Sequence, residues 1–264
     1  MNPGKSIRMN SILNPADGRT VIVALDHGGV AGPLEGIEEP VRVFNECVGG
    51  GADALITTRG FVKATAGLWR RSTSLILKLT GGFTVLGGNF EEEMISSPEA
   101  ALFFGASAAA VTVKFGHPRE GEFIRQASLT ADSCVRWGLP LLVEVLPATA
   151  DGKNSNAGAA RLAARAAQEI GADLVKIAYN DDPESFHRLV KGCPAPVLIL
   201  GGERKKNLEE LFQGIHEALD AGAAGVAMGR SLWQQGRTQA MVEAVVGLVH
   251  KSWSVKQALA HLEK

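Results

Sequence analysis

The sequence is poor in aromatic residues and in cysteine. Aromatic side chains make up 6% of its 264 residues, and Tyr179 is its only tyrosine. The three cysteines, Cys47, Cys134 and Cys193, are widely separated and odd in number. They match neither a disulfide framework nor the close spacing of a metal site, so they predict a protein of a reducing compartment.

Long apolar runs and an excess of charge of one sign are also missing. No stretch approaches the roughly 18 apolar residues that a membrane span needs, and residues 1–13 hold no apolar segment of signal-peptide length. The formal net charge is −1, and no basic run occurs. These features give no reason to expect nucleic acid or a membrane as a partner. We therefore expect a cytoplasmic protein that acts on small polar ligands.

Short β-branched runs, in contrast, recur along the chain at even intervals. They are nearly continuous rather than alternating, as in strands that are buried on both faces of a parallel sheet. The eight runs lie at residues 21–25, 53–57, 74–79, 108–114, 140–146, 173–178, 196–200 and 225–229.

Helical patterns separate these runs. The clearest is an apolar stripe over residues 207–222, and Ser97 before Pro98 is typical of a helix N-terminus. A Gly-Ala pair precedes four of the strands, as at Gly51 and Gly171, where it fits the end of a helix before the next strand. The repeat indicates successive βα units.

Eight such units in about 250 residues predict an α/β fold of the (β/α)8 barrel type, a TIM barrel. An open doubly wound sheet is the alternative, but ALDHGG after the first strand lacks the pattern G-x-G-x-x-G. No linker or shift in composition divides the chain, so we expect a single domain over residues 1–264. Residues 1–20 are predicted to close the bottom of the barrel, and residues 240–264 to form a last outer helix.

The reactive side chains of a barrel lie at the C-terminal ends of its strands. Gly201 and Gly202 follow the seventh strand, and Gly229 and Arg230 follow the eighth. Exposed backbone N–H groups and a guanidinium at these positions favour a bound phosphate, with SLWQQG as a short helix behind them. The alternative is that both glycine pairs only make turns.

Lys176 lies within an apolar strand, in ADLVKIAYNDDP. Burial disfavours an ammonium and lowers its pKa, which makes a lysine nucleophilic at neutral pH. Lys114, two strands earlier, is expected to point into the same layer and to lower that pKa further. In the alternative reading, Lys176 reaches solvent or pairs with Asp181 or Asp182. The residues taken alone leave both possibilities open.

Asp26 and His27 follow the first strand and have the chemistry for general acid/base catalysis. The alternative is an aspartate that stabilises a turn beside a histidine facing solvent. Glu91, Glu92 and Glu93 are expected to form a solvated helix start, because no other ligand type recurs near them at metal spacing. We expect no metal.

Several segments together resemble the class I aldolases of the DeoC/FbaB superfamily. The similarity covers nearly the whole chain and lies in VALDHGGVAGP, ADALITTRGF, LILKL, GASAAAVTV, LPLLVEV, GADLVKIAYNDDP, PVLILGGERKK and GVAMGRSLWQ. Within the superfamily the chain is similar to archaeal-type fructose-bisphosphate aldolases and to the thiolase that processes phosphorylated autoinducer-2.

The resemblance implies roles for particular residues. Lys176 matches the lysine that forms a Schiff base, and Asp26 matches an aspartate that positions substrate hydroxyls. The two glycine pairs, with Arg230, match the phosphate-binding loops. One position differs: the archaeal-type aldolases have an acid/base tyrosine before Pro147, where this chain has Leu146. His27, Glu144, Lys114 or a bound water would have to replace it.

The main hypothesis is therefore an aldehyde-lyase that cleaves or forms a carbon–carbon bond in a phosphorylated ketose such as fructose 1,6-bisphosphate, with Lys176 as nucleophile and no cofactor. A first alternative is a phospho-sugar thiolase with coenzyme A as co-substrate, since the thiolase relatives also lack the tyrosine. A second is a sugar-phosphate-binding protein without catalysis. The resemblance also implies a homo-oligomer, such as a decamer.

Overall fold

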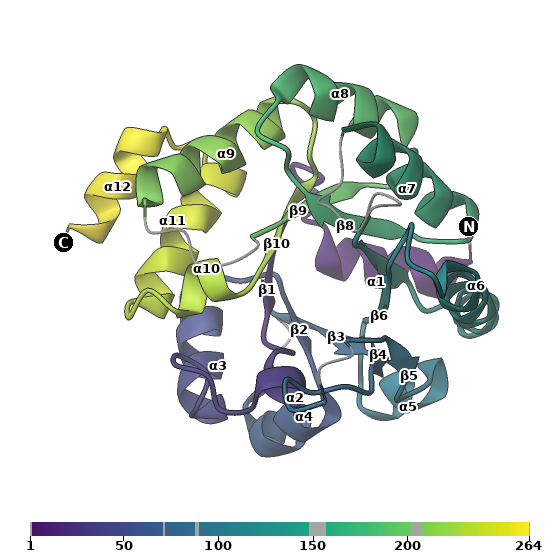
Figure 1. Ribbon diagram of the computed structural model, residues 1–264. Coiled ribbons are helices and arrows are strands. Elements are labelled where there is room, and N and C mark those ends of the chain that lie inside the picture. Colours follow the sequence, from purple (N-terminus) through teal and green to yellow (C-terminus); the bar gives the residue numbers. More distant parts are fainter. Residues whose placement is uncertain (1, 71, 88–89, 148–156, 202–206, 264) are drawn as a thin grey trace.

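The computed structural model describes residues 2–70, 72–87, 90–147, 157–201 and 207–263. Eight parallel strands close into a barrel with helices around its outside, which confirms the predicted (β/α)8 fold (Figure 1). None of the described helices is long and apolar enough to cross a membrane. Each predicted run overlaps one barrel strand, and seven of the eight runs contain it entirely. The order around the barrel is β1 (Thr20–Ala24), β10 (Gly225–Met228), β9 (Val197–Leu200), β8 (Leu174–Ala178), β7 (Leu141–Val145), β6 (Ala108–Val113), β3 (Ser74–Lys78) and β2 (Ala54–Thr57).

The helices begin and end at residues suited to those positions. Ser97 and Asn207 accept backbone N–H bonds at the starts of α5 and α9. Gly51 and Gly171, each before a strand, have φ of 87° and 107°, a conformation that favours glycine. The described helices are α1 (Pro3–Ile12), α2 (Gly28–Ala31), α3 (Pro40–Gly49), α4 (Arg59–Thr65), α5 (Pro98–Phe103), α6 (Glu120–Trp137), α7 (Ala157–Glu169), α8 (Pro183–Gly192), α9 (Leu208–Asp220), α10 (Arg230–Trp233), α11 (Thr238–His250) and α12 (Val255–Leu262), with a short 3₁₀ turn at Ala66–Leu68.

The strands carry two apolar cores because successive side chains point to opposite faces. In β1, Val21 and Val23 pack against the outer helices, whereas Ile22 points into the barrel. Ile12 of α1 is fully buried in this inner core, and Met9 packs beside it. Helix α1 thus fills the N-terminal end of the barrel and leaves only the C-terminal end open for a ligand.

The C-terminal segment differs from the prediction of one outer helix over residues 240–264. It contains most of α11 and then a separate helix, α12. The break has a local cause: Ser252 has a φ of 53°, and Ser254 forms a capping box with Gln257 that starts α12.

The acidic run at residues 91–93 also differs from the prediction, because it is not the start of a helix. Instead, β5 (Glu93–Met94) pairs antiparallel with β4 (Thr80–Gly81). This two-stranded hairpin follows β3 at the C-terminal end of the barrel, and Glu92 beside it is only 6% exposed. The hairpin therefore brings a buried carboxyl group to the open end.

Candidate active site

A cavity of about 390 Å³ lies at the C-terminal end of the barrel. Strand ends and the loops after them supply most of its wall, as expected for a barrel with a filled N-terminal end. The charged and titratable side chains that line it are Asp26, His27, Lys78, Glu92, Glu144, Lys176 and Arg230.

Lys176, on β8, reaches this cavity and is 6% exposed. Its Nζ lies 2.6 Å from Glu144 Oε1. The contact follows from the register, because Glu144 of β7 is the direct neighbour of Lys176 across the two parallel strands. The structure thus differs from the reading in which Lys176 reaches solvent or pairs with Asp181 or Asp182.

Glu144 connects Lys176 to a second buried lysine. Lys78 Nζ lies 2.9 Å from Glu144 Oε2, and Thr112 Oγ1 donates to that same oxygen at 2.7 Å. Burial raises the pKa of Glu144, but the two ammonium groups outweigh it and hold the pKa well below its ordinary value. Burial lowers the pKa of Lys78, but Glu144 and Asp26 reverse the shift and raise it. Glu144 is therefore an anion between two cations.

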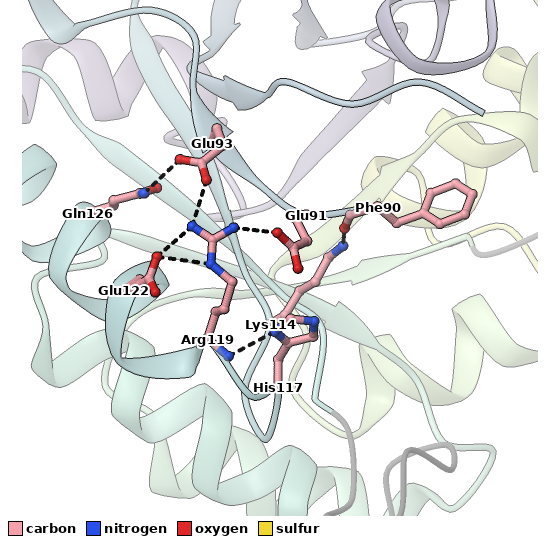
Figure 2. Close-up of polar contacts among 8 residues, drawn as sticks. All are labelled: Phe90, Glu91, Glu93, Lys114, His117, Arg119, Glu122 and Gln126. Carbon is pink, nitrogen blue, oxygen red and sulfur yellow. Dashed lines mark hydrogen bonds and ion pairs between the residues drawn. The ribbon is translucent and has the colours of Figure 1, made fainter. Parts of the chain in front are cut away.

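Lys114 does not take the place predicted for it. Its Nζ contacts the backbone carbonyl of Phe90 (Figure 2). The same Nζ lies 5.1 Å from the centroid of the Phe83 ring. The physical reason is that β6 ends at Val113, so Lys114 belongs to the loop after the strand and its side chain does not line the cavity. The cation next to the Lys176–Glu144 pair is Lys78 instead.

Asp26 and His27 both line the cavity, as the sequence indicated. His27 Nδ1 lies 3.5 Å from Asp26 Oδ1, and the imidazole packs edge-on against Trp233 with centroids 5.3 Å apart. Burial lowers the pKa of His27, and the nearby cations Lys176 and Arg230 lower it further against the opposing effect of Asp26. The imidazole is therefore neutral at pH 7.

Three of the four residues predicted to bind phosphate line the same cavity. Gly201, Gly229 and Arg230 line it, whereas Gly202 lies outside the described residues. At Gly229 an added Cβ would lie 2.8 Å from Ala24 O and from His27 Cε1, so only glycine fits there. The predicted short helix is α10, which begins at Arg230.

Three side chains of this site, Lys78, Glu144 and Glu92, were not among the principal catalytic candidates from the sequence. Lys78 and Glu144 are charged residues inside apolar strand runs, which is the same signal that identified Lys176. Glu92 was missed because the hairpin that buries it was not predicted. Leu146, the position of the expected tyrosine, lines the cavity and is 37% exposed.

Comparisons with known proteins agree with this arrangement. The DeoC/LacD family aldolase profile matches residues 20–235. A 2-amino-3,7-dideoxy-D-threo-hept-6-ulosonate synthase of Archaeoglobus fulgidus is 31% identical over 98% of this chain and 95% of its own length. A 3-hydroxy-5-phosphonooxypentane-2,4-dione thiolase of Enterobacter sp. is 33% identical over 97% of this chain and 84% of its own length.

A solved structure extends the similarity to three dimensions. It is an archaeal fructose-1,6-bisphosphate aldolase with its catalytic lysine covalently bound to the carbinolamine intermediate of the substrate. It superposes with a TM-score of 0.83 and 30% identity, covering 93% of this chain and 99% of that one. From its fold and sequence, the chain described here belongs to the DeoC/LacD family of aldolases.

Proposed function

We propose that this protein is a class I aldolase in which Lys176 forms a Schiff base with a phosphorylated ketose. The observation that carries the proposal is the position of Lys176 Nζ, buried in the cavity wall and 2.6 Å from Glu144 Oε1. The archaeal relative reacts through a catalytic lysine on the same fold, which supports this assignment.

The environment of Nζ suits an imine as well as an ammonium. To attack a carbonyl carbon, the amine must lose a proton, and Glu144 Oε1 is an acceptor within hydrogen-bond reach. Loss of water from the carbinolamine then gives a protonated imine, which is again a cation at the same atom. When Glu144 passes the accepted proton to the departing water, it becomes an anion again and stabilises that cation.

A phosphate group is the second expected feature of the substrate. Gly201 and Gly229 offer backbone in the cavity wall, and Arg230 adds a fixed positive charge beside them. Anchoring a phosphate there would hold the ketone carbon near Lys176 without taking part in the chemical step. Fructose 1,6-bisphosphate, the substrate named for the archaeal relative, is the first compound to test.

One observation favours a second candidate, acyl transfer to coenzyme A. Leu146 places an apolar side chain in the cavity where the resemblance implies an acid/base tyrosine, and a relative at 33% identity is a thiolase. A thiol acceptor would remove the need for a proton donor at that position. The two candidates share the lysine adduct and differ in whether coenzyme A is consumed.

The decisive experiment is borohydride reduction in the presence of dihydroxyacetone phosphate, followed by peptide mass spectrometry. The expected adduct lies on Lys176 and is absent with unphosphorylated dihydroxyacetone at the same concentration. Lys176→Met should abolish the adduct and lower kcat by at least about 10³-fold. Lys114→Met is the matched control and should retain the adduct. Failure of the native protein to form it with any phosphorylated ketone would contradict the proposal.

A further inference from the structure

In the acidic run at residues 91–93, Glu91 and Glu93 point to one side of the segment and Glu92 points to the other. Arg119, just before α6, lies 2.5 Å from Glu91 Oε2 and 2.7 Å from Glu93 Oε1, and it also donates to Glu122 (Figure 2). Gln126 donates to the second oxygen of Glu93. Glu91 and Glu93 are therefore fixed on the outside of the barrel by one guanidinium.

Glu92 points the other way, as alternation along an extended segment requires. It lines the cavity and is 6% exposed, whereas Glu91 and Glu93 do not line it. Burial raises the pKa of Glu92, and the hydroxyl of Thr80 is among the groups that lower it. The carboxyl oxygen Oε2 is buried and has no hydrogen-bond partner among the described residues. A buried carboxyl oxygen without a partner is costly, and here it belongs to a side chain in the cavity wall.

Thr80, which acts on the Glu92 carboxyl group, is also hydrogen-bonded to the strand that carries Thr112. Thr80 Oγ1 accepts the N–H of Thr112 at 2.9 Å, and the hydroxyl of Thr112 donates to Glu144. Lys78 and Glu144 also act on Glu92 electrostatically. Glu92 is thus tied to the wall of the same cavity in which Lys176 meets Glu144.

We propose that Glu92 is the catalytic acid/base group of this aldolase, the group that moves the substrate proton where Leu146 leaves no tyrosine. This inference rests on the proposed function. In the cleavage direction, the Glu92 carboxylate takes the proton of the substrate hydroxyl next to the bond that breaks. The O–H electrons form the aldehyde carbonyl, and the electrons of the C–C bond move into the imine of Lys176 to give an enamine.

The cycle then closes without any other reagent than water. The aldehyde leaves, and the Glu92 carboxyl group returns its proton to the enamine carbon, which restores the iminium and the carboxylate. Water hydrolyses the iminium and frees Lys176 with the ketone product. One proton has moved from oxygen to carbon, and Glu92 ends in its starting state.

The other two carboxylates of the cavity are less suited to this step. Glu144 is bonded through both oxygens and has a pKa well below its ordinary value, which makes it a weak base. Asp26 lies between His27 and Lys78. Burial raises the pKa of Glu92 against the opposing effect of Lys78, which brings it closer to the working pH of a general acid/base.

The test measures the proton transfer directly. In D₂O, the native protein should exchange the carbon-bound proton next to the carbonyl of dihydroxyacetone phosphate for deuterium, and NMR monitors this exchange. The native protein should also form the borohydride adduct. Glu92→Gln should still form the adduct, but its rate of proton exchange should be at least about 100-fold lower than that of the native protein. It should also remove the limb of the pH profile on which the rate rises as a carboxyl group loses its proton.

Two further variants separate catalysis from structure. Glu92→Asp restores a carboxyl group, and its rate of proton exchange should be about tenfold higher than that of Glu92→Gln. Glu91→Gln changes the same charge on the outer side and should stay within about threefold of the native rate, since Glu93 and Glu122 still hold Arg119.

The outcomes distinguish the two proposals. If the native protein forms no adduct, the proposed function fails and the role of Glu92 fails with it. If the adduct forms in both proteins and exchange is equal, only the role of Glu92 is wrong. If Glu92→Gln loses adduct and exchange together, Glu92 supports the site rather than moving the proton, and the proposal is overturned.

Discussion

The two ends of the barrel both carry buried charged residues but use them differently. At the N-terminal end, Asp53 Oδ2 accepts the N–H of Val21 at 2.6 Å, and Asp173 Oδ2 accepts the N–H of Leu141 at 2.9 Å. Lys5 Nζ lies 2.8 Å from that same Asp173 oxygen. These carboxylates bind the backbone of the neighbouring strand, so they contribute to the fold, and neither lines the cavity at the C-terminal end.

At the C-terminal end the contacts run between side chains around an open space. Glu144 of β7 meets Lys176 and Thr112 of the two adjacent strands and Lys78 of β3, one strand further along the barrel. Side chains that bind only one another can exchange a partner for a ligand, whereas a strand N–H cannot. The difference shows why a charged side chain at the C-terminal ends of barrel strands indicates catalysis or binding, whereas one at the N-terminal ends indicates a contribution to stability.

The largest expected effect on stability comes from breaking the C-terminal arrangement with Glu144→Gln. The amide leaves the buried ammonium groups of Lys78 and Lys176 without their shared anion, which should destabilise the fold by about 3–5 kcal/mol. Turnover should fall as well, because the cation at Lys176 loses its counter-charge. Urea unfolding at pH 7 and kcat measure the two effects.

The pH dependence of stability sharpens this test. The lowered pKa of Glu144 means that its contribution is complete above about pH 4.5 and is lost as the pH falls toward the native pKa. The raised pKa of Lys78 means that its contribution is complete below about pH 10.5 and is lost above it. The loss in the free energy of unfolding caused by Glu144→Gln should therefore be largest between these two pH limits. An equal loss at pH 3 would show that the ion pairs with Lys78 and Lys176 are not its cause.

The fold was predictable because its signals are local. Apolar runs identify strands buried on both faces, and the repeated Gly-Ala pairs mark the helix ends between them. The repeat G-A-D at residues 51–53 and 171–173 even places the two aspartates that bind strand N–H groups. The break between α11 and α12 was missed, although Ser254 and Gln257 form the S-x-x-Q pattern of a capping box, which is also a local signal.

The site was predictable in part, for a different reason. A lysine inside an apolar strand points to Lys176, but its partner depends on the register between β7 and β8, which no local pattern contains. The placement of Lys114 was wrong by one residue, since β6 ends just before it. Glu92 depends on a hairpin only two residues long on each side, too short to leave a pattern.

A smaller effect is expected at the N-terminal end from Asp173→Asn. The amide oxygen can still accept the N–H of Leu141, but Lys5, 7% exposed, loses its ion pair. We expect a loss of about 1–3 kcal/mol in the free energy of unfolding and an unchanged kcat. A lower free energy of unfolding with an unchanged kcat distinguishes Asp173→Asn from Glu144→Gln, which should lower both. A fall in kcat matching that of Glu144→Gln would show that the N-terminal end is not purely structural.

The smallest effect is expected at His250, which connects the N-terminal end to α11. Its Nε2 lies 2.9 Å from Asp53 Oδ2 and its Nδ1 lies 2.6 Å from Asp17 Oδ2. Burial lowers the pKa of His250, but the two carboxylates outweigh it and raise the pKa. The stability that this charge supplies is complete below about pH 6.5 and is lost as the pH rises through the raised pKa.

His250→Gln should therefore destabilise the protein by about 1 kcal/mol at pH 6, and by less at pH 9, with turnover unchanged. The matched control is His216→Gln, because His216 also pairs with an aspartate, Asp220, but its side chain is 42% exposed. Such a surface pair should leave the urea midpoint unchanged at both pH values. An equal change of the urea midpoint in both variants would contradict this explanation. It would show that the contribution of His250 to stability does not come from its burial between two carboxylates.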